Sequence, residues 1–134
     1  MNKLPIIIAT IFFAGIIAIT PGCGLAPLTG GPTQPEKLLD GTYEGSSRHG
    51  PNKALVRVTI TNGMIEKVEL VKYFASWKGA RANEIIPQRI VEQQSTSVDA
   101  VTGATNSSRV IMNAAQEAIN KAYGQDQPEK IERR

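Results

Sequence analysis

The sequence is poor in the side chains that build metal and disulfide sites. It contains one cysteine, Cys23, and one histidine, His49, among 134 residues. A lone cysteine cannot form an internal disulfide, and neither residue can hold a metal ion without further ligands. We therefore expect no metal site and no disulfide framework.

The sequence also lacks the common nucleotide-binding fingerprints and a strong excess of one charge. Neither GxxxxGK[ST] nor GxGxxG occurs in it. The formal net charge is only +3, and the basic residues are scattered along the chain. Because nucleic-acid binding requires a clustered basic face, we expect no nucleic-acid partner. No nucleophile triad or acid–base pair is evident either, so the residues alone give no sign of a stand-alone enzyme.

What is present at the N-terminus is a secretion signal. Lys3 gives a basic start, residues 4–19 are almost wholly apolar, and Gly22 precedes Cys23. The apolar run is shorter than the roughly 18–20 residues that a spanning helix needs. We therefore predict a signal peptide over residues 1–22. Cys23 stands where bacterial lipoproteins carry their acylated cysteine, which predicts a lipid anchor on the extracytoplasmic face of the cell membrane. The alternative is an ordinary signal followed by an unpaired cysteine.

Composition divides the remaining chain into three parts. Residues 23–36 are rich in glycine and proline and are predicted to be a flexible, lipid-anchored tether. Residues 37–124 are predicted to be the folded domain. Residues 125–134 are charged and are predicted to be a C-terminal tail.

Within the domain, apolar alternation predicts three antiparallel strands. The first covers residues 40–45, a polar loop covers 46–53, and the second strand covers 54–61. Asn62-Gly63 is a strong hairpin signal, and residues 64–71 form the returning strand.

Helical spacing dominates the second half of the domain. A helix is expected over residues 83–94, with Pro87 early in it, and residues 95–98 could form a fourth strand. The last helix carries a stripe of small residues through Ala122 and stops at Gly124. The fold class is therefore α+β: a small antiparallel sheet of three to four strands packed against two helices.

The segment VDAVTGATNSS, residues 98–108, joins this final helix to the preceding turn. Gly103 permits a positive φ, and the helix that follows offers unpartnered amides that favour an anionic group. On residue types alone, the simpler interpretation is that Thr105, Asn106 or Ser107 caps the helix.

Asp99-Ala100-Val101-Thr102-Gly103-Ala104-Thr105 resembles the flavinylation motif D-x-x-[ST]-G-A-T of the FMN-binding domain family. That family includes the C subunit of the sodium-pumping NADH:quinone reductase, the G subunit of the related ferredoxin oxidoreductase, and lipoproteins of extracellular electron transfer. The resemblance extends over most of the domain, through Asp40 to Gly45, Val56 to Ile65, Ile86 to Val91, and Gln94-Ser95 with Val98-Asp99.

The resemblance implies that FMN is esterified through its phosphate to Thr105. A separate Mg²⁺-dependent flavin transferase would use FAD as donor and release AMP. Asp99, Thr102, Gly103 and Ala104 would position the hydroxyl and be recognised by that transferase. Asn106 and Ser107 complete the predicted cofactor site.

The chain departs from the family pattern after its third strand. Tyr73, Phe74 and Trp77 replace the Glu-Thr pair and glycine-rich loop that many members have. These aromatic side chains are candidates for stacking on the isoalloxazine ring, with core or rim positions as the alternative.

Two functions are compatible with this sequence. The first is a membrane-anchored extracytoplasmic electron carrier with covalent FMN, reduced by a membrane donor such as a quinone-linked reductase. The second is a lipoprotein binding or interaction module that holds FMN non-covalently or not at all.

Overall fold

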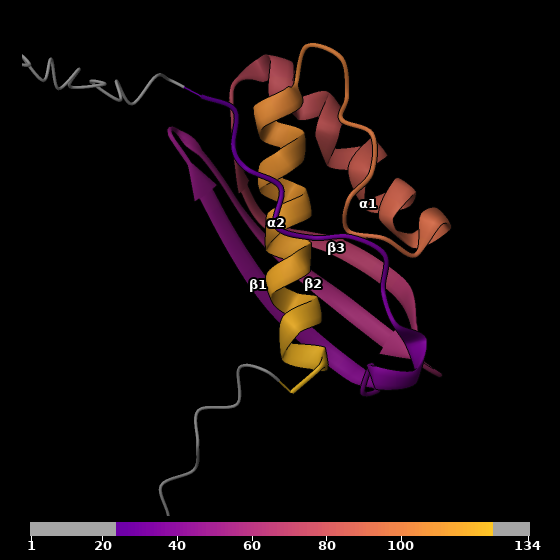
Figure 1. The fold of residues 1–134 in the computed structure, drawn as a ribbon. Helices are drawn as coiled ribbons and strands as arrows, with labels where there is room; N and C mark the ends of the chain where they lie inside the picture. The colour runs from indigo at the N-terminus through magenta and orange to yellow at the C-terminus, as the bar shows by residue number, and fades with distance from the viewer. Residues whose placement is uncertain (1–23, 125–134) are drawn as a thin grey trace, which may run out of the picture.

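A computed structural model describes residues 24–124, so the predicted signal peptide, Cys23 and the predicted tail lie outside the described residues. Three strands and two α-helices, with two short 3-10 helices, form an α+β domain, as the sequence predicts. Figure 1 shows both α-helices on one face of the sheet. In chain order, the elements are η1 (Pro35–Lys37), β1 (Gly41–His49), β2 (Asn52–Thr61), β3 (Met64–Phe74), η2 (Trp77–Arg81), α1 (Ala82–Gln93) and α2 (Thr105–Ala122).

The sheet is an antiparallel meander in the order β1-β2-β3. Asn62 and Gly63 turn the chain between β2 and β3 with φ values of 53° and 71°. Two positive φ values are what a two-residue hairpin turn of this kind requires, and the asparagine–glycine pair supplies them.

The strands are longer than the sequence predicts. The expected loop over residues 46–53 is largely strand, because Ser46 pairs with Leu55 and Arg48 pairs with Lys53. This part of the hairpin has a solvent-exposed face, and polar side chains there do not prevent the backbones from pairing. β3 likewise continues past Val71 to Phe74, opposite Lys53.

Helix α2 lies closely against the first two strands. Its buried side chains are mostly small, and Gly45 of β1 faces the helix backbone at Ala114 and Ala118. A Cβ at position 45 would overlap the carbonyl oxygen of Ala114 and the amide nitrogen of Ala118. The stripe of small residues on α2 and the missing side chain at Gly45 together permit this close approach. Helix α1 packs against β3 and against α2.

Two details of the second half differ from the expectation. Pro87 is buried inside α1 rather than at its beginning, so the carbonyl of Asn83 has no N–H four residues ahead to accept. Residues 95–98 do not form a fourth strand. Ser95 makes a single bridge with Pro32. α1 ends with Gln94 in the left-handed conformation, and it is the Gln94 side chain that hydrogen-bonds the backbone of Ile65 on the edge strand β3.

The expected flexible tether is in contact with the domain throughout residues 24–34, which we call the N-terminal segment. Figure 1 shows its first part running along α2 before the segment crosses the helix. Its backbone accepts or donates hydrogen bonds at many positions, including Ala26 N–H to Asn106 Oδ1 and Thr29 N–H to Asn113 Oδ1, each 3.1 Å. Ala26 is 1% exposed. The domain therefore begins earlier than residue 37.

Among the described residues, the helices are too short or too polar to cross a bilayer.

Candidate functional site

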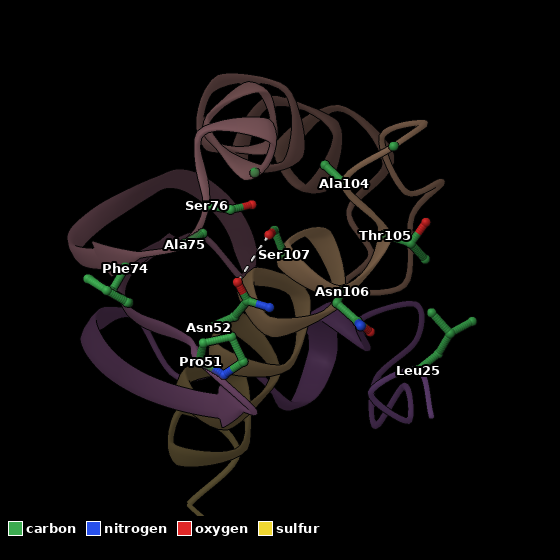
Figure 2. A pocket seen from close by; sticks show the side chains of 12 residues that line it. Leu25, Pro51, Asn52, Phe74, Ala75, Ser76, Ala104, Thr105, Asn106 and Ser107 are labelled. Atoms are coloured by element: carbon green, nitrogen blue, oxygen red, sulfur yellow. Dashed lines mark hydrogen bonds between the residues drawn. The ribbon is translucent and has the colours of Figure 1, made fainter. Parts of the chain in front are cut away.

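A pocket of about 610 Å³ opens at the end of the sheet where α2 begins. Its size is within the range of ordinary small-molecule sites. Figure 2 shows that its walls come from the β1–β2 turn, the end of β3, the N-terminal segment and the start of α2. The residues that line it are Leu25, Pro51, Asn52, Phe74, Ala75, Ser76, Gly79, Gly103, Ala104, Thr105, Asn106 and Ser107.

A turn followed by a helix start places the last three residues of the motif on this pocket. Gly103 has a φ of 80°, and a Cβ added there would meet no atom within 4 Å. The glycine is therefore required by backbone conformation and not by crowding. Ala104 is buried and precedes the first helical residue, Thr105.

No side chain caps the start of α2, so the expectation that Thr105, Asn106 or Ser107 is an N-cap is wrong. The cap position is held by Ala104, whose carbonyl accepts the Ser108 N–H at 2.9 Å. The side chains of Asn106 and Ser107 contact residues outside the helix instead. Asn106 Oδ1 accepts the Ala26 N–H, and Ser107 Oγ lies 3.4 Å from Asn52 Oδ1.

The first backbone amides of α2 consequently remain available. Within residues 24–124, the N–H groups of Thr105, Asn106 and Ser107 donate no hydrogen bond, and neither does the Thr105 hydroxyl. These three residues all line the pocket. Unpartnered amides at a helix start carry a partial positive charge, which favours an anion there.

The remaining motif residues lie elsewhere. Asp99 and Thr102 are exposed and do not line the pocket. The backbone carbonyl of Asp99 accepts a hydrogen bond from the Arg89 guanidinium at 2.5 Å. The structure therefore brings together Gly103 and the four residues that follow it at the pocket, and leaves Asp99 and Thr102 facing solvent.

The three candidate aromatic side chains are separated from one another. Tyr73 points towards the core and donates its hydroxyl to the Gly79 carbonyl at 3.0 Å, and burial raises the pKa of this phenol. Phe74 is 66% exposed and forms one wall of the pocket. Trp77 is 82% exposed and is not part of the lining. Phe74 is thus the aromatic side chain that can meet a ring in the pocket.

Several residues that shape the site were missed by sequence reasoning. Asn52 and Ser76 provide polar groups on the wall opposite α2, and Leu25 provides an apolar one. Gly79 lies against Ser107, whose Oγ would overlap a Cβ at position 79. Leu25 gave no signal, because it belongs to a segment whose composition suggests a tether.

The site has no acidic side chain in its lining. In the described part of the chain, no three His, Cys, Asp or Glu side chains are grouped so that they could hold a metal ion. A partially positive helix start, polar groups on one side and apolar walls formed by Leu25 and Phe74 suit a flat ligand that carries a phosphate.

Comparisons with known proteins agree with this geometry. The family described as FMN-binding domain matches residues 49–120. An uncharacterized protein of Treponema pallidum (strain Nichols) is 38% identical over 99 residues, which cover 70% of this chain. The match covers 25% of that relative's length. The crystal structure of the CPE2226 protein from Clostridium perfringens has a similar fold, with a TM-score of 0.53 at 18% identity, covering 66% of this chain and 92% of that one.

Proposed function

The chain belongs to the FMN-binding domain family, and from this premise we propose that it carries FMN covalently on Thr105 as a membrane-anchored electron-transfer protein. One observation carries the proposal. The Thr105 hydroxyl lies at the start of α2 without a hydrogen-bond partner among the described residues, beside amides that are also unpartnered. A phosphate ester at this oxygen would place its negative charge at the positive end of the helix.

The residues around Thr105 fit the rest of the cofactor. The pocket of about 610 Å³ offers Phe74 and Leu25 as apolar walls for a ring system, and Asn52 and Ser76 as polar groups. Gly103, two residues before Thr105, has open space where a side chain would stand. When bound, FMN supplies the redox chemistry, while the chain holds the flavin and shields part of it from water.

Attachment is a phosphoryl transfer between FAD and the Thr105 hydroxyl. An ester bond forms between Thr105 Oγ1 and the phosphorus next to the flavin ribityl chain. The pyrophosphate bond of FAD breaks, AMP leaves, and the hydroxyl proton is released. We assign this step to a separate Mg²⁺-dependent flavin transferase. The exposure of Asp99 and Thr102 supports a role for them in recognition by that enzyme.

The cellular setting of the proposal rests on the N-terminal sequence. Cys23 would carry the lipid after removal of residues 1–22, and the domain would then lie on the extracytoplasmic face of a bacterial membrane. There a covalent bond prevents loss of the cofactor. The electron donor we propose is a quinone-linked reductase in the same membrane.

The test is flavin fluorescence of the denatured protein in a gel, supported by intact mass. The full chain, co-expressed with a flavin transferase, should give a bright band. Thr105→Val should give none, because it keeps the side-chain shape and removes the nucleophilic oxygen. Thr42→Val, which changes an exposed threonine on β1, serves as the matched control and should label normally.

Other outcomes separate the alternatives. Equal fluorescence of Thr105→Val and the natural chain would show that the attachment site is elsewhere. A natural chain that is yellow when native but loses its flavin on denaturation would favour the non-covalent binding module.

A further inference from the structure

The end of the molecule around the pocket exposes large apolar side chains. Leu25, Phe74 and Trp77 are 55%, 66% and 82% exposed. They come from the beginning of the N-terminal segment, the end of β3 and η2, which lie at the same end of the molecule as the start of α2 (Figure 1). Figure 2 shows Leu25 and Phe74 on opposite sides of the pocket. Single exposed apolar residues are common, but a group around one opening indicates a surface that is covered in use.

Basic residues surround these apolar side chains. Arg48, Lys53 and Lys72 line, together with Phe74, a groove of about 580 Å³ on the face of the sheet away from the helices. Lys78 Nζ lies 5.5 Å from the centroid of the Trp77 ring, and Arg81 ends the same 3-10 helix. We call Leu25, Phe74 and Trp77, together with these five cations, the aromatic–basic end.

The cations of the aromatic–basic end are free for an external partner. The ion pairs found within residues 24–124 are Arg57–Glu44, Lys67–Glu69 and Lys121–Glu117, and they involve none of the five. The nearest carboxylate along the chain from Trp77 is Glu84, on α1. The aromatic–basic end is therefore complementary to a partner whose surface is negatively charged and whose interior is apolar.

The position of Gly24, where the described chain begins, indicates which partner the aromatic–basic end contacts. The Gly24 carbonyl lies 2.9 Å from His49 Nε2 at the end of β1, so the described chain begins at the aromatic–basic end. Gly24 is bonded directly to Cys23, which our proposed function makes the lipid-bearing residue. Tryptophan at the interface and lysine or arginine at anionic headgroups are the usual means by which proteins contact a bilayer.

We propose that the aromatic–basic end lies on an anionic phospholipid surface. Trp77, Phe74 and Leu25 enter the interfacial region, and the five cations contact phosphate groups. The mouth of the flavin pocket then faces the bilayer, where a quinone-linked donor would meet it. An acidic protein surface is the competing partner, and the charge pattern alone would accept either.

Trp77 makes this proposal directly measurable, because it is the only tryptophan of the chain. The full chain carrying Thr105→Val is used, so that no covalent flavin quenches the indole. It is mixed with vesicles of phosphatidylglycerol or phosphatidylcholine whose acyl chains carry bromine. Phosphatidylglycerol vesicles should shift the Trp77 emission to shorter wavelength and quench it, and phosphatidylcholine vesicles should do so several-fold less.

Charge variants assign the effect to these residues. Arg48→Gln, Lys53→Gln and Lys72→Gln combined should reduce the quenching by phosphatidylglycerol vesicles several-fold. The matched control combines Lys37→Gln, Lys67→Gln and Lys121→Gln, which lie on η1, at the start of β3 and at the end of α2. The control set should quench like the parent.

Three results would overturn the proposal. Trp77 emission that stays unshifted and unquenched while the chain floats with the vesicles would leave the aromatic–basic end facing water, available to an acidic protein. If the chain fails to float with phosphatidylglycerol vesicles, it does not bind an anionic lipid surface. If both triple variants lose the same amount of Trp77 quenching, the binding cannot be assigned to Arg48, Lys53 and Lys72. Trp77 emission and flotation are measured on a flavin-free chain. A natural chain that proves colourless would therefore contradict the proposed function and leave this test of membrane binding unaffected.

Discussion

Ser108 holds the motif loop against α2, although the motif itself stops at Thr105. It is 0% exposed, and its Oγ accepts the Val101 N–H at 3.0 Å and donates to the Ala104 carbonyl at 2.8 Å. One hydroxyl therefore fixes both sides of Gly103. Through these bonds Ser108 acts as a positioning residue for Thr105.

Ser108→Ala should destabilise the fold by about 1–3 kcal/mol, because the Val101 N–H would remain buried without a partner. It should also slow the labelling of Thr105 by a flavin transferase, since residues 101–104 would lose their connection to the helix. Urea unfolding of flavin-free protein and the initial labelling rate measure the two effects. Ser46→Ala, on the exposed face of β1, should change neither, and equal behaviour of the two variants would contradict this role.

Sequence reasoning predicted the start of the last helix near Thr105 but was wrong about which residue caps it. The motif pattern predicts the position of the helix start correctly, because Gly103 and the following apolar spacing determine where α2 can begin. It does not predict which side chain caps the helix. Asn106 and Ser107 make hydrogen bonds to Ala26 and Asn52, which are distant in sequence, and no local pattern contains that information.

The contact between β1 and α2 depends on the absence of a side chain at Gly45. Gly45→Ala would drive a methyl group into the backbone of α2 at Ala114 and Ala118, where no side chain can rotate away. We expect a loss of about 3 kcal/mol or more, at the upper end of overpacking effects. Thermal unfolding followed by circular dichroism measures it.

The control for this substitution is Gly31→Ala. A Cβ at position 31 would meet no atom within 4 Å. Its effect should stay within about 0.5 kcal/mol, as for most surface substitutions. Similar stabilities of the two variants would mean that α2 can move away from β1 at little cost.

The element order was predictable because each long element shows a clear period. The alternation along β2, the Asn62-Gly63 turn and the small-residue stripe of α2 all appear in the structure. The N-terminal segment was not predictable in this way. Its glycine and proline content reports only local preferences, whereas its hydrogen bonds come from Asn106 and Asn113 on the last helix.

The acid stability of the whole domain should depend on Asp40, whose carboxylate joins the start of β1 to the β2–β3 turn. Its oxygens accept the N–H groups of Asn62 and Gly63, each at 3.0 Å. The Gly63 hydrogen bond, and then that of Asn62, hold the pKa of Asp40 below its ordinary value of 3.8. The ionised form is favoured by folding, so this stabilisation is present above pH 3.8 and is lost as the pH falls through the lower, folded-state value.

Unfolding by urea at several values between about pH 6 and pH 2 measures this dependence. The free energy of unfolding of the natural chain should fall towards the acid end of this range. The free energy of unfolding of Asp40→Asn should be lower than that of the natural chain at neutral pH, and it should decrease less as the pH falls. Equal slopes for both proteins would show that Asp40 contributes no pH dependence to folding. Glu69, whose pKa the Lys67 ammonium lowers through a hydrogen bond, should account for part of the remaining slope.

The packing of residues 24–34 along α2 determines how far the proposed lipid-anchored carrier can travel. No free length of this segment remains between Gly24 and the domain. If Cys23 carries a lipid as proposed, the flavin of such a carrier could not reach across the space outside the membrane. Its encounters depend on lateral diffusion within the plane of the bilayer. The rate of electron delivery should then scale with the areal density of partners in that membrane, and a soluble acceptor would have to come to the surface to collect electrons.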